Sequence, residues 1–267
     1  MSYFRHGGIE FCFEEHGNGT PFIFSHGLGG NLSQVLDLIG DLPDTRLIVY
    51  DNRAHGRTRP LGDRAKLGFE VMANDMAALL DHLNLLRVFV GGVSMGAGIS
   101  LAFSFRYPQR VKGLVLSRPA WLDVGNPPHL SVFSVIANLV ERLGLEQARR
   151  EFEQTTLYKD LQKDYPASAK SLADLFDNQS SEAMVASFQA IPASVPVDSL
   201  DQLHILDIPS LVLANRNDPI HPFELAEALA NKLPGSRFRE FPSKTESLTE
   251  HYRQFRQFVI EFLSTAD

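Results

Sequence analysis

The sequence predicts an α/β fold built on a mostly parallel sheet, and two observations support it. Short apolar runs of β-branched and aromatic residues alternate with longer stretches that have the period of amphipathic helices. The apolar runs lack the polar alternation of a half-exposed strand, so helices should cover both faces of the sheet. A chain of 267 residues is long enough for one large domain with an insertion.

The N-terminal residues predict an antiparallel hairpin at one edge of this sheet. GIEFCFEEHG alternates apolar and polar residues, and Gly7-Gly8 supply the turn before it. Apolar strands follow in the stretches TPFIFSHG, TRLIVYDN, RVFVGGVS and VKGLVLS. Helical patterns lie between them in VMANDMAALLDHLNL and MGAGISLAFSFRYP, each ended by a turn signal or a proline. Such alternation is typical of a parallel sheet with helices on both faces.

The pattern changes near Ala120. Residues 130–190 contain helix-like segments with no convincing strand between them, which indicates a helical insertion between two halves of the sheet. The sheet returns in IPSLVLANRND and SRFREFPS, with the helix PFELAEALANKL between them and a last helix ending in FVIEFL. We therefore assign residues 1–119 and 201–267 to the core of the protein and residues 120–200 to a helical cap.

Composition and charge exclude several classes of partner. The formal net charge of −7 argues against nucleic acid and against an anionic membrane surface. Cys12 is the only cysteine, so no internal disulfide can form, and no stretch approaches the ~18 apolar residues of a membrane span. We expect a soluble, cytoplasmic protein that acts on a small molecule, with no metal and no cofactor. Nothing in the sequence indicates its oligomeric state.

The most specific motif is Gly92-Val93-Ser94-Met95-Gly96. It closes one strand and opens a helix, which is the strained turn that raises a serine hydroxyl clear of a sheet. Glycine at 92 and 96 lets the strand and the helix approach each other closely. A plain structural glycine turn is the alternative, but the position between strand and helix favours a nucleophile at Ser94.

A serine that attacks a carbonyl needs hydrogen-bond donors for the developing oxyanion. The strand PFIFSHGLGGN ends in a glycine-rich loop, which can present the backbone N–H of Leu28 beside that of Met95. The same loop could be an ordinary turn or a phosphate cradle. A phosphate cradle is disfavoured because GLGG lacks the lysine of a P-loop and the spacing of a dinucleotide-binding motif.

The order SHGLGG, YDNRAHGRTRP, GGVSMGAG, YPQRVKGLVLS and ANRNDPIHP resembles the α/β-hydrolase fold family across essentially the whole chain. The resemblance implies that Ser94 is the nucleophile, that Leu28 and Met95 form the oxyanion hole, and that residues 120–200 cap the site. Asp218 stands where the family places the acid of its catalytic triad. In DNRAHGR, by contrast, the resembling loop of the family is mainly structural, so its charged residues receive no chemical role.

The identity of the nucleophile selects a branch of that family. Haloalkane dehalogenases and epoxide hydrolases resemble this chain in outline but carry aspartate at the elbow. Serine at position 94 favours acyl transfer on an ester, lactone, thioester or related carbonyl, as in carboxylesterases and lactonases. The sequence therefore predicts a hydrolase.

The catalytic histidine is missing from its usual place. In most relatives a Gly-His pair precedes the first aromatic residue of the closing helix by about ten residues, which here leads to Thr245 in SKTES. His251 is our candidate instead. Ser247 and Glu250 fit a capping box, so His251 lies in the first turn of the last helix, on the same stripe as Phe255. That end of the helix should lie at the carboxyl edge of the sheet, where α/β folds bind ligands. We predict that Asp218 orients His251 and that His251 takes the proton of Ser94.

Other roles and functions remain open. His221 follows the candidate acid by three residues, which is cramped for a base, so we expect it, with Trp121, to contact the substrate. Further apolar residues of the cap could line the pocket, although packing alone would explain each of them: Leu130, Phe133, Ile136, Phe152 and Phe188. The rival function is a small-molecule binding or signalling homologue that lost turnover with its Gly-His pair. Cofactor-free lyase or oxygenase chemistry is a third possibility by family analogy alone.

Overall fold

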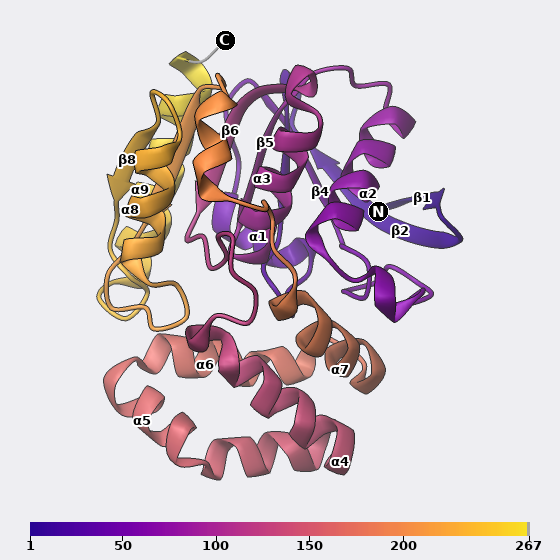
Figure 1. The fold of residues 1–267 in the computed structure, drawn as a ribbon, viewed down its shortest axis with the longest axis vertical. Coiled ribbons are helices and arrows are strands. Elements are labelled where there is room, and N and C mark those ends of the chain that lie inside the picture. The colour runs from indigo at the N-terminus through magenta and orange to yellow at the C-terminus, as the bar shows by residue number, and fades with distance from the viewer. Residues whose placement is uncertain (266–267) are drawn as a thin grey trace.

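The computed structural model describes residues 1–265 and contains an eight-stranded sheet with the order β1-β2-β4-β3-β5-β6-β7-β8 (Figure 1). From β4 to β8, every pair of neighbouring strands in the sheet is parallel. β1 pairs antiparallel with β2, and β2 pairs antiparallel with β4. The prediction of a mostly parallel sheet with an antiparallel edge is confirmed. The strands are β1 (Ser2–His6), β2 (Ile9–His16), β3 (Thr20–Ser25), β4 (Thr45–Tyr50), β5 (Val88–Val93), β6 (Val111–Ser117), β7 (Ser210–Ala214) and β8 (Arg237–Glu240).

The edge hairpin forms as its glycines require. Gly7 and Gly8 have φ values of 57° and 79°, the left-handed region that a two-residue hairpin turn needs at both positions. The turn sets the register that pairs His6 with Ile9 and Phe4 with Phe11. Phe4 and Phe11 then stack with ring centroids 5.1 Å apart.

Helices cover both faces of the sheet and create two separate apolar cores. Alternate residues of a strand face opposite sides, so that Phe22 and Phe24 pack on one layer of helices while Ile23 packs on the other. One layer is α1 (Leu32–Ile39) and α9 (Leu248–Thr265); the other is α2 (Phe69–His82), α3 (Met95–Arg106) and α8 (Phe223–Lys232). Short 3-10 turns connect these elements: Arg64–Lys66, Pro108–Arg110, Pro128–Leu130, Leu175–Asp177, Ile191–Ala193 and Leu200–Ile205.

The chain between β6 and β7 is helical and forms a separate layer at one end of the sheet (Figure 1). Its helices are α4 (Ser131–Gln154), α5 (Thr156–Asp164), α6 (Pro166–Asp174) and α7 (Ser181–Ala190). Gly144, with φ 72°, kinks α4. Phe133 of α4 meets Phe188 of α7 edge-on with ring centroids 5.0 Å apart, so these two side chains contribute to the packing of α4 on α7. The exact boundaries at 120 and 200 stay a prediction.

The start of α9 differs from the expected capping box. The hydroxyl of Ser247 does accept the N–H of Glu250 at 3.3 Å, but the Glu250 carboxylate binds Arg253 and not the backbone of Ser247. The reciprocal bonds form one turn earlier, because Ser243-x-x-Glu246 has the same pattern. There the N–H of Ser243 donates to Glu246 Oε2 at 2.7 Å and the N–H of Glu246 to Ser243 Oγ at 3.2 Å.

Candidate active site

Ser94 lies at the sharp turn from β5 to α3 with φ 55° and ψ −114°. A non-glycine residue with positive φ is uncommon, and such strain is concentrated at functional sites. The turn is possible because its neighbours lack side chains. A Cβ on Gly92 would lie 2.1 Å from the carbonyl carbon of Gly96, and a Cβ on Gly96 would lie 2.1 Å from the carbonyl oxygen of Ser25. The motif at residues 92–96 therefore has the geometry of a nucleophile elbow.

The loop after β3 lies directly against this elbow. A Cβ on Gly27 would be only 3.5 Å from the Cβ of Ser94. The loop is fixed by two bonds: the N–H of Gly27 donates to Gln34 Oε1 at 2.7 Å, and the N–H of Gly29 donates to His55 Nε2 at 3.1 Å. No described residue accepts a hydrogen bond from the N–H of Leu28, so this donor is available beside Ser94.

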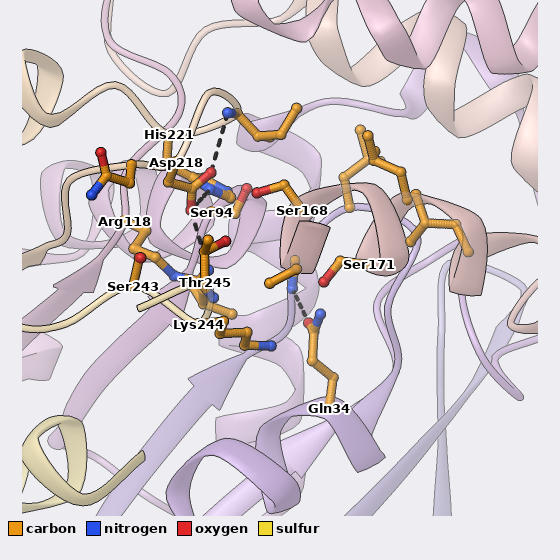
Figure 2. A pocket seen from close by; sticks show the side chains of 18 of the residues that line it. Gln34, Ser94, Arg118, Ser168, Ser171, Asp218, His221, Ser243, Lys244 and Thr245 are labelled. Atoms are coloured by element: carbon orange, nitrogen blue, oxygen red, sulfur yellow. Dashed lines mark hydrogen bonds and ion pairs between the residues drawn. The ribbon is translucent and has the colours of Figure 1, made fainter. Parts of the chain in front are cut away.

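A pocket opens above Ser94, with about 750 Å³ of empty space including its mouth. The core supplies one wall and α4 and α6 of the cap supply another. Its polar lining is Gln34, Ser94, Arg118, Ser168, Ser171, Asn217, Asp218, His221, Ser243, Lys244 and Thr245. Figure 2 shows most of these side chains around the pocket, with Ser94 beside Asp218 and His221. The hydroxyl of Ser94 makes no hydrogen bond to any residue from 1 to 265, and Ser94 lines this space.

Asp218 is bonded to His221 and not to the expected His251. His221 Nδ1–H donates to Asp218 Oδ2 at 2.8 Å, and the N–H of Ile220 donates to Oδ1 at 3.1 Å. Arg118 Nη1 lies 3.5 Å from Oδ2. Burial opposes ionisation of Asp218, but the charge and hydrogen bond of His221 and the charge of Arg118 outweigh it. They hold the pKa of Asp218 well below its usual range. Asp218 is therefore a carboxylate, and its bond orients the ring of His221.

His251 faces inward on α9, as its helical position predicts, but it does not line the pocket. Its Nδ1–H donates to the carbonyl oxygen of Pro242 at 2.9 Å, and the ring packs on Phe241 with centroids 4.8 Å apart. Its Nε2 is buried without a hydrogen-bond partner in the described chain. Burial and then the nearby charge of Arg118 lower the pKa of His251 to about 3. The structure thus gives His251 no bond to either Ser94 or Asp218, and its role as base stays a prediction.

Trp121 and most of the apolar cap residues proposed for the pocket lie in the core. Trp121 is buried edge-on against Phe69, with centroids 5.3 Å apart, and is not part of the lining. Phe133 does line the pocket. The other four pack among buried neighbours outside it: Leu130, Ile136, Phe152 and Phe188. The apolar face of each helix is used chiefly for packing.

Two charged lining residues had not been anticipated from the sequence, Arg118 and Lys244. Arg118 follows β6 directly, so a search of the residues after each parallel strand would have found it. Lys244 precedes Thr245, the position counted back from the closing helix, and both line the pocket. Burial, and then the charge of Arg118, lower the pKa of Lys244 to about 8.

Comparison with known proteins identifies the family. The model of the alpha/beta hydrolase fold matches residues 20–248. The chain belongs to the α/β-hydrolase fold family. It is 27% identical to a protein of Pseudomonas syringae pv. syringae named "Putative carbamate hydrolase RutD", over 96% of this chain and 98% of that one. It is 26% identical to 3-oxoadipate enol-lactonase 2 of Acinetobacter baylyi, over 74% of this chain and 71% of the lactonase.

Solved structures agree with this assignment. A thermophilic esterase from Thermogutta terrifontis superposes with a TM-score of 0.75 at 27% identity, over 97% of each chain. The enol-lactonase of Burkholderia xenovorans shares the fold with a TM-score of 0.76 over 98% of this chain and 100% of that one. The predicted fold family is confirmed, and so is the prediction of an α/β-hydrolase enzyme.

Within residues 1–265, no three side chains of His, Cys, Asp or Glu gather as metal ligands would. None of the helices in that range has the length and apolar character needed to span a bilayer.

Proposed function

We propose that this hydrolase cleaves a small ester, lactone or related carbonyl compound through an acyl-enzyme on Ser94. The observation that supports it most is the Asp218–His221 pair, which lines the same pocket as the elbow serine. An acid that holds one ring nitrogen of a histidine leaves the other nitrogen to act as a base. In His221 the bonded atom is Nδ1, and Nε2 makes no hydrogen bond to the described residues.

The proposed reaction follows from these positions. Ser94 Oγ attacks the carbonyl carbon while His221 Nε2 takes the hydroxyl proton, and Asp218 stabilises the imidazolium that forms. The N–H groups of Leu28 and Met95 stabilise the oxyanion. The imidazolium then returns its proton to the leaving oxygen, and water activated by the same histidine releases the acid and frees Ser94. Catalytic bonds are often long before substrate binds, so the absence of a Ser94–His221 bond is compatible with this sequence.

This assignment moves the base from His251 to His221. The sequence spacing alone argues against His221 as the base, because only two residues separate it from Asp218. The turn resolves this crowding: its first residue, Asp218, accepts the backbone N–H of His221 at 3.3 Å as well as its ring N–H. The presence of an oriented imidazole in the pocket also weakens the rival function of a binding protein without turnover.

A fluorophosphonate probe tests the nucleophile. We expect covalent labelling of the wild-type protein at Ser94, located by peptide mass spectrometry, and none in Ser94→Ala. Labelling at another residue, or ester hydrolysis that persists in Ser94→Ala, would refute the proposed mechanism.

Parallel variants test the base. General base catalysis contributes about 100- to 10,000-fold, so His221→Asn should lower kcat by a factor in that range. His251→Asn should change kcat far less, because its ring has no bond to the site. The reverse result would return the role of base to His251, as the sequence alone predicts.

A further inference from the structure

The pocket around Ser94 contains a positive charge without a counter-ion. Among its charged lining residues, Arg118 and Lys244 are cationic and Asp218 is anionic. Arg118 lies within ion-pair distance of Asp218 and balances it. Lys244 has no carboxylate within ion-pair distance in residues 1–265. The lining therefore has one cation more than the protein itself neutralises.

The surroundings of Lys244 destabilise the charged form of its side chain. The Lys244 side chain is partly buried, and its ammonium lies over the face of Tyr252, 5.7 Å from the ring centroid. That distance is near the outer limit of a cation–π contact. The carboxylates of Asp218, Asp174 and Asp37 act on it only from beyond ion-pair distance. Asp218 is already held by Arg118 and His221, and Asp174 is held by Lys170 at 2.6 Å. An ammonium that has lost water without gaining an anion is destabilised, so an anionic ligand would be favoured here.

The backbone that carries Lys244 is held in place. The reciprocal bonds of Ser243 and Glu246 close the turn on both sides of it, and Asn217 Nδ2 donates to Glu246 Oε1 at 2.9 Å. Asn217 immediately precedes Asp218. The lysine is thus tied to the loop of the candidate acid, and its position relative to the reacting centre is set by the fold.

Free hydrogen-bond donors gather on the same side of the pocket. Figure 2 shows the Lys244 side chain extending toward Gln34, with Ser171 nearby and the Asp218–His221 pair on the other side. Gln34 Oε1 is occupied by the N–H of Gly27, which leaves its Nε2 to donate. The hydroxyl of Ser171 on α6 has no side-chain hydrogen bond within residues 1–265. A cation beside several groups that can donate hydrogen bonds, with no carboxylate among them, suits a carboxylate ligand.

We propose that Lys244, assisted by Gln34 and Ser171, binds a carboxylate that the substrate carries away from its reacting carbonyl. The substrate class is then that of half-esters of dicarboxylic acids and of lactones or esters with a free acid group. The inference deepens the proposed function, because the reacting carbonyl is that of the Ser94 mechanism. One unpaired cation matches one carboxylate, which favours this anion over a doubly charged phosphate.

Matched esters test the preference. Monomethyl glutarate is compared with methyl pentanoate, and 4-acetoxybutanoate with butyl acetate, so that the carboxylate lies in either half of the ester. We expect the wild-type kcat/KM to favour a charged member by about tenfold or more, and Lys244→Gln to remove most of that preference through KM. Lys244→Arg should restore part of it, and exposed Lys163→Gln should keep all of it. A preference absent in the wild type, or unchanged in Lys244→Gln, would overturn the proposal.

A binding measurement separates this proposal from the mechanism. Glutarate is titrated by calorimetry into Ser94→Ala, into Ser94→Ala with Lys244→Gln, and into Ser94→Ala with Lys163→Gln. We expect binding in the first and third and an affinity at least about tenfold lower in the second. If no ester is hydrolysed but glutarate binds through Lys244, the mechanism fails and the anion site stands. If esters are hydrolysed but glutarate affinity is the same in all three, the anion site fails alone.

Discussion

The backbone conformation of Ser94 depends on the absence of a side chain at the neighbouring glycine, Gly96. A left-handed backbone at a serine is unfavourable by itself and persists only where the surroundings impose it. Here the surroundings are backbone atoms: α3 packs so closely on β3 that Gly96 has no room for a Cβ beside Ser25. Glycine at this position therefore controls both the packing of the helix and the direction of the nucleophile.

Gly96→Ala should destabilise the protein and impair the site together. Its Cβ would meet the carbonyl oxygen of Ser25 at 2.1 Å, and backbone cannot move aside as a flexible side chain can. We expect a loss of about 1–3 kcal/mol in the free energy of unfolding, measured in urea, with reduced fluorophosphonate labelling of Ser94. Gly68→Ala is the control, because its Cβ would have an ordinary contact of 3.4 Å with Ser194. Equal stability of the two variants would contradict this account.

The sequence predicted individual site residues unevenly, for a physical reason. Ser94 directly follows β5, and Asp218 comes four residues after the end of β7, so their place at the carboxyl edge of the sheet was predictable. Helical period also predicted that His251 is buried. It could not predict that the carbonyl of Pro242, outside the helix, would bind that ring, or that a tight turn would let Asp218 hold His221. Such contacts depend on loop conformation, which side-chain periodicity does not encode.

At the scale of elements, the fold itself was largely predictable. Apolar strands and intervening amphipathic helices leave few arrangements other than a covered parallel sheet, and the observed topology is one of them. The cap was predictable as helical, but the part of it that faces the pocket was not. Each cap helix has an apolar face, and the choice between a neighbouring helix and a ligand cavity follows from tertiary packing.

The turn before α9 gives a prediction at this scale. Glu246 binds the backbone N–H of Ser243, whereas Glu250, the residue the pattern first suggested, binds the exposed Arg253. Glu246→Ala should therefore lower the free energy of unfolding by about 0.5–2 kcal/mol, and Glu250→Ala by at most about 0.5 kcal/mol. Urea denaturation measures both.

The same pair of variants should differ in substrate binding. Loss of the Ser243–Glu246 bonds frees the turn that carries Lys244, so Glu246→Ala should raise KM for the charged esters more than for their neutral partners. Glu250→Ala should leave the ratio unchanged. A larger effect of Glu250→Ala on stability and on KM would show that the box operates at residues 247–250.

At the scale of the whole molecule, charge is distributed unevenly. The protein has a formal net charge of −7, yet its pocket is lined by more cationic than anionic side chains.

Three histidines are fully buried in the core, His26, His55 and His251. Burial lowers the pKa of His26 to about 4, and burial together with nearby positive groups lowers the pKa of the other two to about 3. All three are therefore neutral in the folded protein near neutral pH.

These histidines should make the fold sensitive to acid. Each has an ordinary pKa of about 6.5 in the unfolded chain, so below that pH the unfolded state binds protons that the folded state does not. The contribution of these neutral histidines to the free energy of unfolding is then fully present above pH ~6.5. It is lost as the pH falls toward their pKa values in the folded protein, by about 2 kcal/mol for each histidine at pH 5. Comparing urea denaturation at pH 7 and pH 5 isolates this window, since most carboxylates stay ionised there. His251→Gln should lose about 2 kcal/mol less than the wild type between the two pH values, whereas His204→Gln, at an exposed position, should lose as much. If His251→Gln shows the full wild-type loss, His251 takes up its proton in the folded state as readily as in the unfolded chain, and the burial of its ring does not suppress its charge.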